Sequence, residues 1–225
     1  MTPPTTLGYR TACRTVELGR AAFFSGRDVD IPVAESELIR SDDQLPQFGY
    51  VGSKYSAKRI LFLGINPGNG PRACRNVGDG FQMPLLERFV AAPTVENFQR
   101  AQNAYREACQ SWFIWGRECN ELLALGGLQI DDIAFSNALP WRTASEAAFG
   151  RGVERLTAAH YVKPLLDELQ PRIVVAVGKK VQRMLSETGS CTASLVVWNR
   201  ARALTQSVRA ERQKAGELLR HLVCQ

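Results

Sequence analysis

The chain has 225 residues, of which 45% are hydrophobic and 22% charged, the ordinary balance of a globular protein. No apolar run approaches the ~20 residues that span a membrane, and the first ten residues lack the apolar stretch of a signal peptide. Collagen, coiled-coil, disordered and membrane classes are therefore excluded. We expect a soluble cytoplasmic protein with a single domain over residues 1–225, in which residues 1–58 form a helical and loop extension packed on the core.

The net charge of +6 is unevenly distributed along the chain. Residues 196–225 hold six basic and two acidic residues, whereas residues 28–43 hold six acidic residues and one arginine. A basic C-terminal face suits the phosphate backbone of a nucleic acid. The alternative is that the terminal helix is simply rich in arginine and solvated.

Cysteine and histidine spacing bears on metal binding and on nucleophilic catalysis. The six cysteines form no Cys-x-x-Cys pair, and the histidines are His160 and His221. Zinc and iron–sulfur sites normally show clustered ligands, so we expect free thiols of a reducing compartment, no metal and no other cofactor. Two histidines also leave little room for Ser-His or Cys-His catalysis.

Apolar runs and helical spacing alternate along the chain. The expected helices cover residues 11–24, 95–109, 111–125, 153–169 (with a kink or restart at Pro164), 179–187 and 207–223. The expected strands cover residues 59–64, 132–137, 172–178 and 194–198. Strands that alternate with helices pair in parallel through right-handed crossovers. The predicted fold is a three-layer α/β/α domain with a central four-stranded parallel sheet.

Candidate functional residues follow these strands, because ligands bind at the carboxyl ends of an open parallel sheet. The first strand is followed by Gly64-Ile65-Asn66-Pro67-Gly68, the second ends at Asn137, and Asn199 follows the fourth. An asparagine offers one acceptor and two donors, which match the carbonyl and N–H edge of a pyrimidine. As generic loop features, the same residues would turn the chain and cap helices. Neither G-x-G-x-x-G nor the Walker motif is present, so a phosphate-cradling loop is not indicated.

These segments resemble the uracil-DNA glycosylase superfamily over about residues 59–204. The run Gly64-Ile65-Asn66-Pro67-Gly68 resembles the first motif of its mismatch-specific uracil/thymine branch. Gly78-Asp79-Gly80-Phe81 resembles the following loop of that branch, which supplies an aromatic ring. Phe135-Ser136-Asn137 is similar to the strand end that carries the base-reading asparagine, and residues 171–179 resemble the third strand and the helix start.

One motif departs from the superfamily. After the last strand the superfamily commonly has His-Pro-Ser or Asn-Pro-Ser, followed by a residue that is wedged into the duplex. This chain has Asn199-Arg200-Ala201-Arg202-Ala203-Leu204, in which Asn199 can take the first position but the proline and serine are missing. The departure concerns the stabilisation of the departing base. The clustered cysteines of the iron–sulfur branches are absent as well.

The resemblance implies a DNA-repair glycosylase of base excision repair, which hydrolyses the N-glycosidic bond of a uracil flipped out of DNA. Its catalytic candidates are Asn66, which would position the water, Asp79 as an alternative base, and Asn199. The substrate would be bound by Gly64, Ile65, Pro67, Phe81, which would stack on the base, and Asn137, which would read its edge. Backbone N–H groups around Ile65 and Phe81 would stabilise the base anion. Arg200 and Arg202 would contact phosphates, and Leu204 would enter the vacated space in the duplex.

Each of these residues also has a purely structural interpretation. Phe81 would be a core aromatic, Asn137 a turn cap and Asp79 a turn-former between glycines, and the arginines would be solvated. Two other functions stay open: a nucleic-acid binding protein without efficient chemistry, and an enzyme acting on a free nucleoside or nucleotide. The expected partner is DNA that contains uracil or a related deaminated base, and the expected state is a monomer without membrane contact.

Overall fold

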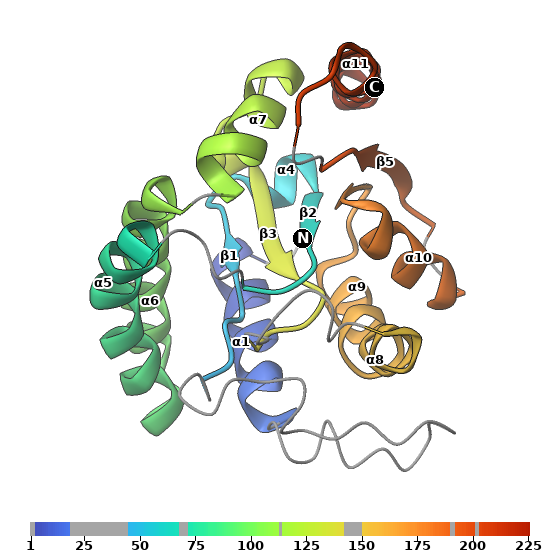
Figure 1. Ribbon diagram of the computed structural model, residues 1–225. Coiled ribbons are helices and arrows are strands. Elements are labelled where there is room, and N and C mark those ends of the chain that lie inside the picture. Colours follow the sequence, from blue (N-terminus) through green and yellow to red (C-terminus); the bar gives the residue numbers. More distant parts are fainter. Residues whose placement is uncertain are drawn as a thin grey trace.

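The computed structural model describes residues 3–18, 45–67, 72–112, 114–141, 150–189, 192–200 and 203–225, and for residues 72–79 it describes the backbone alone. In these ranges the protein has an α/β fold on a five-stranded, mostly parallel sheet with strand order β1-β3-β2-β4-β5 (Figure 1). The strands are β1 (Tyr50–Val51), β2 (Ile60–Gly64), β3 (Ile133–Asn137), β4 (Ile173–Val177) and β5 (Ser194–Trp198). The main helices are α1 (Pro4–Leu18), α4 (Tyr55–Lys58), α5 (Arg72–Ala91), α6 (Val95–Ala108), α7 (Asn120–Gly126), α8 (Arg151–Thr157), α9 (Lys163–Leu169), α10 (Lys179–Glu187) and α11 (Gln206–Cys224).

The four predicted strands are confirmed, and they pair in parallel as expected. Gly64 stands opposite Asn137, and Val177 stands opposite Trp198, so the four carboxyl ends lie along one edge of the sheet. Every residue of β2, β3 and β4 is buried, because helices cover both faces. This double burial explains why the sequence shows continuous apolar runs instead of alternation.

The described sheet has one strand more than predicted, because β1 pairs antiparallel with β3 and forms an additional edge strand. It lies within residues 1–58, where we expected only a helix and a loop. Two residues are too short to show a period in the sequence. The Gln102 side chain of α6 completes this edge, since it accepts from the Val51 N–H at 2.8 Å and donates to the Gly49 carbonyl at 2.9 Å.

The two faces of the sheet are covered by different helices. Leu61, Leu63 and Ala176 point to one face, where residues of α8, α9 and α10 complete the core. Phe62 and Val175 point to the other, where α7 and α11 pack (Figure 1). Successive residues of a strand point to opposite sides, so each strand supplies both layers.

A third apolar cluster lies beside β1, where α5 and α6 run side by side (Figure 1). Leu86, Phe89 and Phe98 are buried there against α1. The helix α5 corrects the loop expected at residues 78–81, because the whole segment is helical. Its glycines and Pro84 argue against a helix in isolation, and packing of its apolar face overrides those local preferences.

The other helices largely follow the prediction. The helix α10 has the predicted bounds, and α6 and α11 begin and end within one residue of theirs. The helix expected over 11–24 is α1, which begins at Pro4; residues 19–44 lie outside the described residues. Two predicted helices contain a π-helical turn instead of a regular course: η2 (Trp115–Cys119) before α7, and η5 (Ala158–Val162) between α8 and α9. Pro164 lies in the first turn of α9, so the expected restart is confirmed. In the described part of the chain, no helix is long and apolar enough to cross a membrane.

Candidate functional site

The carboxyl ends of β2 and β3 bring Gly64 and Asn137 into direct contact. Pairing continues beyond the strands, since the Ala138 N–H donates to the Gly64 carbonyl and the Leu139 N–H donates to the Ile65 carbonyl, both at 2.8 Å. A Cβ atom on residue 64 would lie 2.5 Å from Oδ1 of Asn137. The carboxamide therefore occupies the space that the missing side chain of Gly64 leaves.

The Asn137 carboxamide has no hydrogen-bond partner among the described residues. The residue as a whole is 7% exposed, but its side-chain nitrogen and oxygen are not fully buried, in contrast to the indole nitrogen of Trp112. The polar end of the side chain therefore reaches the surface at the strand ends, where its two donors and its acceptor are available to a ligand. The interpretation of Asn137 as a turn cap requires a bond to a backbone N–H, which is absent from the described contacts.

The motif after β2 turns away from the strand within three residues. Ile65 is buried in the core, Asn66 is half-buried, and Pro67 is buried. The Asn66 side chain donates to its neighbour's carbonyl, that of Pro67, at 3.4 Å, a long and weak hydrogen bond. Asn66 thus lies two residues beyond the Gly64–Asn137 pair on the same edge of the sheet.

Phe81 and Asp79 are on α5 and not on a loop at the strand ends. The ring of Phe81 is 49% exposed, which rules out the core-aromatic interpretation. No described contact joins Phe81 to Asn137, and the side chain of Asp79 lies outside the described residues. In the interior of a helix the backbone N–H at position 81 is bonded within that helix. It is therefore not available to stabilise a base anion, which corrects that expectation.

The ends of β4 and β5 meet at Gly178 and Arg200. Gly178 has φ of +106°, a conformation that glycine adopts far more readily than other residues, and its N–H donates to the Trp198 carbonyl at 2.9 Å. A Cβ atom on residue 178 would lie 3.9 Å from Cβ of Arg200. Leu204, just before the α11 N-cap, is 44% exposed, and Arg202 lies outside the described residues.

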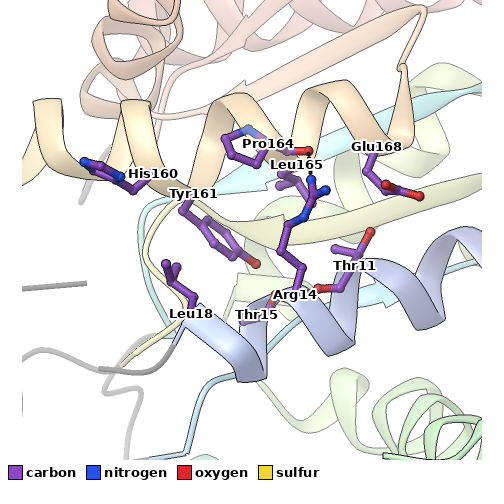
Figure 2. A pocket seen from close by; sticks show the side chains of 9 residues that line it. All are labelled: Thr11, Arg14, Thr15, Leu18, His160, Tyr161, Pro164, Leu165 and Glu168. Atoms are coloured by element: carbon purple, nitrogen blue, oxygen red, sulfur yellow. Dashed lines mark hydrogen bonds between the residues drawn. The ribbon is translucent and has the colours of Figure 1, made fainter. Parts of the chain in front are cut away.

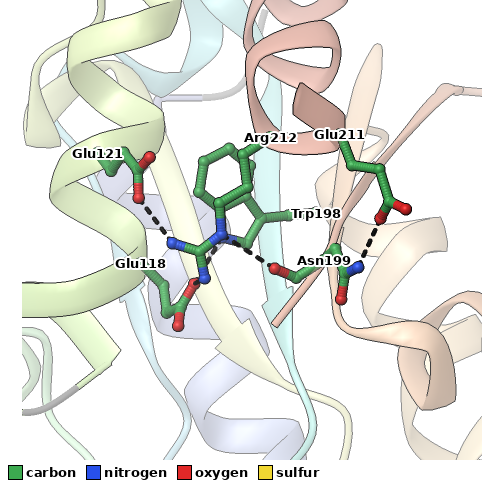
Figure 3. A network of polar contacts seen from close by, with 6 residues as sticks. All are labelled: Glu118, Glu121, Trp198, Asn199, Glu211 and Arg212. Carbon is green, nitrogen blue, oxygen red and sulfur yellow. Dashed lines mark hydrogen bonds and ion pairs between the residues drawn. The ribbon is translucent and has the colours of Figure 1, made fainter. Parts of the chain in front are cut away.

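Two consecutive residues of α11 bond Asn199, one at its side chain and one at its main-chain carbonyl (Figure 3). Its side-chain NH₂ donates to the Glu211 carboxylate, and its carbonyl accepts from Nε of Arg212 at 3.1 Å. The bond to Glu211 engages the Asn199 carboxamide, which we expected to take part in catalysis. Asn199 at the end of β5 is separated from Asn137 at the end of β3 by three strand spacings, about 14 Å.

A buried ionic network lies beneath Asn199 (Figure 3). Arg212 bonds Glu118 of η2 at 2.5 Å and Glu121 of α7 at 2.7 Å, and its guanidinium lies 4.7 Å from the centre of the Trp198 ring. The Trp198 indole N–H also donates to Glu118 at 2.6 Å. Sequence reasoning missed this network, although a signal was present. Arg212 lies on the buried stripe of α11 with Ala215, Gly216 and Leu219, at helical spacing.

A second polar contact leads from β3 to a shallow hollow between α1 and α9 (Figure 2). The Tyr161 hydroxyl lies 3.2 Å from the Ser136 hydroxyl, next to Asn137 in the chain. Burial raises the pKa of Tyr161, so the phenol stays neutral. The hollow is open to solvent, and Arg14 crosses it to donate to the Pro164 carbonyl at 3.3 Å. It lies on the Tyr161 side of β3 and not at Gly64.

The sequence-predicted residues therefore fall into separate groups. Gly64, Ile65, Asn66, Pro67 and Asn137 come together at the ends of β2 and β3, whereas Asn199, Arg200 and Leu204 follow β5, and Phe81 is on α5. Within the described ranges, no three His, Cys, Asp or Glu side chains converge as metal ligands do. No protein-family model matches this chain, and no curated protein matches it.

Proposed function

We propose that this protein is a DNA-repair glycosylase that hydrolyses the N-glycosidic bond of a uracil flipped out of DNA. The observation that carries the proposal is the Asn137 carboxamide, which lies against Gly64 at the strand ends, is not fully buried, and has no hydrogen-bond partner among the described residues. A uracil edge supplies a carbonyl acceptor and an N–H donor in the plane, and one carboxamide satisfies both. Cytosine reverses donor and acceptor at that edge, so it pairs poorly with the carboxamide in the orientation in which Oδ1 lies against Gly64.

Bond cleavage leaves negative charge on the base and positive charge on the sugar. In this proposal Asn66, half-buried beyond the Gly64–Asn137 pair, positions the attacking water. A neutral carboxamide does not take up the proton as a carboxylate does, so we expect modest turnover. Asp79 stays the alternative base. The exposed ring of Phe81 stays the candidate for stacking on the base, which requires the DNA to reach α5.

The test is excision of uracil from a labelled oligonucleotide, followed by alkaline cleavage at the abasic site. We expect strand scission with the wild-type protein and none with Asn137→Ala, while the affinity for DNA changes little. The matched control is Asn120→Ala, because Asn120 is a half-buried asparagine whose side chain donates to Gln110 at 3.0 Å. Absence of scission by stoichiometric wild-type protein would refute the proposal.

A second function is favoured by one observation, the hydrogen bond between Asn199 and Glu211. An Asn199 side chain held by Glu211 does not reach a departing base, and the proline and serine that follow it in the superfamily are missing here. The protein would then bind damaged DNA without efficient chemistry. Salt-dependent binding of uracil-containing DNA without release of free uracil distinguishes this function from the first.

A further inference from the structure

The carboxyl end of β3 is paired with another strand on one side only. Pairing with β2 runs to the last residue, Asn137, and continues beyond it, whereas the register with β1 ends at Phe135. The side chain of Ser136 points to the face opposite to that of Asn137, since successive residues of a strand alternate. A contact that holds Ser136 on its own face therefore also fixes the main chain from which the Asn137 carboxamide extends.

A chain of buried hydroxyl groups from η5 and α1 holds Ser136 on that face (Figure 2). The Tyr161 hydroxyl lies 3.2 Å from the Ser136 hydroxyl, and it also bonds the hydroxyl of Thr15. Thr15 uses its single proton for the Thr11 carbonyl, at 2.7 Å, so its oxygen accepts from Tyr161. The Tyr161 oxygen then accepts from Ser136. All three hydroxyl residues are buried, so water does not compete for these bonds.

The Ser136 hydroxyl also lies against the main chain of Asn137. It is 3.4 Å from the Asn137 carbonyl oxygen, a long contact, because Ser136 has one proton and gives it to Tyr161. Without the Tyr161 hydroxyl this proton is free to bond the Asn137 carbonyl. The Ser136 side chain would then turn and draw on the peptide group next to the carboxamide.

A π-helical turn brings Tyr161 to this position. The turn η5 joins α8 to α9 without a break in the helical course. Pro164 has no N–H for the carbonyl of His160, four residues earlier, and its ring crowds that carbonyl, so a regular α-helical turn is disfavoured here. The wider turn changes the direction of the side chains within it. Turns of this kind are rare, and they are frequent at functional sites.

We propose that Tyr161 and Ser136 are positioning residues for Asn137, and that the hydroxyl chain through Thr15 fixes the carboxamide that reads the base. This inference rests on the proposed function, and it adds to that function two residues that do not touch the substrate. Because the chain of hydroxyls ends on α1, this N-terminal helix supports the site as well as the core.

Two tyrosines on the same face of the sheet separate positioning from stability. Tyr55 belongs to the same apolar cluster as Tyr161 and donates its buried hydroxyl to the Leu169 carbonyl at 3.1 Å, but its helix α4 leads into the opposite, amino end of β2. Tyr161→Phe and Tyr55→Phe each remove one buried hydroxyl, so both should lower the melting temperature by a similar few degrees. In single-turnover excision of uracil, well below both melting temperatures, only Tyr161→Phe should be slower, by about tenfold, with unchanged affinity for DNA.

Ser136→Ala tests whether Tyr161 acts through this one contact. We expect this variant to excise uracil more slowly as well. Because both substitutions break the same hydrogen bond, the variant that carries Ser136→Ala and Tyr161→Phe together should be no slower than the slower single variant. Losses that multiply in the double variant would mean that Tyr161 does not act through Ser136, which overturns the proposal.

Nuclear magnetic resonance tests the same inference without any activity. The side-chain NH₂ signals of Asn137, identified by their loss in Asn137→Ala, should shift in Tyr161→Phe and stay in place in Tyr55→Phe. Unshifted signals in Tyr161→Phe, or equal slowing of excision in the two tyrosine variants, overturns the positioning role. If Tyr161→Phe does not fold, Ser136→Ala decides by the same two measurements. A wild-type protein that excises no uracil refutes the glycosylase, and the Asn137 signals then decide the positioning role alone.

Discussion

The absence of a side chain at position 64 leaves the space that the Asn137 carboxamide occupies. In Gly64→Ala the added methyl would lie 2.5 Å from Oδ1 of Asn137, so the carboxamide must move. Because the displaced group is the end of a side chain, we expect the melting temperature to fall by only a few degrees. Excision should fall by about 10²-fold, since misplacing a recognition group by about 1 Å has that cost.

The measurement is the single-turnover excision rate beside a thermal melt of the same preparation. Gly116→Ala is the control, because a Cβ atom there meets nothing within 4 Å and Gly116 is not among the candidate site residues. A Gly64→Ala protein that excises uracil at the wild-type rate would contradict the placement of Asn137 in the site.

Two buried thiols should respond to pH in a defined direction. Burial raises the pKa of Cys109 to about 12 and raises that of Cys119 as well. The folded state therefore disfavours the thiolates, and the stabilisation that this gives is fully present below the ordinary thiol pKa of about 8.5. It is lost as the pH rises from there towards 12. We expect the free energy of unfolding to decrease over this range in urea titrations.

The same burial predicts a labelling pattern. Alkylation of the native protein at pH 8, read by mass spectrometry, should modify the exposed Cys224 and spare Cys109 and Cys119 until the protein unfolds. Rapid native modification of Cys119 would show that η2 opens.

At the level of single residues, the sequence predicted the position of some candidates in the fold and not of others. Asn137 was expected at the end of a strand because an asparagine ends an apolar run, and β3 ends there. The engagement of Asn199 with Glu211 was not predictable, because it depends on how α11 returns across the end of β5. Arg212 was counted with the exposed basic residues, although its helical phase puts it in the core.

Among the elements, the π-helical turn η2 and the helices α7 and α11 are joined by charge as well as by apolar packing. Glu118 is buried in this junction, whereas the side chain of Glu121 is 43% exposed. Removing Glu118 leaves Arg212 buried with half of its countercharge, so Glu118→Ala should destabilise the protein by about 3–5 kcal/mol. Glu121→Ala should cost about 0.2–1 kcal/mol, because water screens that pair.

Urea unfolding followed by circular dichroism measures both values. Equal effects of the two substitutions would mean that burial does not set the strength of the pairs. The indole N–H of Trp198, which also bonds Glu118, gives a second readout, since its fluorescence should change only in Glu118→Ala.

The elements that the sequence failed to predict share a cause. The helix α5 contains Gly78, Gly80 and Pro84, and it is stabilised in an apolar cluster with Ala12 and Phe48, which are distant in the chain. Strand β1 is too short to carry a pattern, and it is held by its pairing with β3 and by the Gln102 side chain, both distant in the chain. In contrast, the four longer strands coincide with continuous local runs of mostly apolar residues, so the sequence predicts their positions.

For the whole molecule, the excess of positive charge predicts how binding responds to salt. Each phosphate contact contributes about −0.9 to the slope of log affinity against log salt on duplex DNA. If Arg200 and Arg202 each contact a phosphate, then Arg200→Ala with Arg202→Ala should flatten that slope by about 1.8. Fluorescence anisotropy with labelled oligonucleotides at several salt concentrations measures it. An unchanged slope would show that both arginines serve another purpose.

At this scale the class of fold followed from the alternation of strands and helices, and the edge of the sheet that carries the candidate residues followed from parallel pairing. The distribution of those residues along that edge did not, because it depends on the strand order. Chain order alone would place β2 beside β3 and then β4 beside β3, whereas β4 pairs with β2. The order β3-β2-β4-β5 separates Asn137 from Asn199 by the width of two intervening strands.

The side chain of Gln102 has a consequence for self-association. It bonds the Val51 amide of β1 and the carbonyl of Gly49, just before β1, along the outer margin of the sheet. A second chain that docked there by strand addition would first have to displace a glutamine bonded at both points. The rim next to α6 is thus closed to intermolecular β-pairing, and the sheet is protected on that side against growth into aggregates.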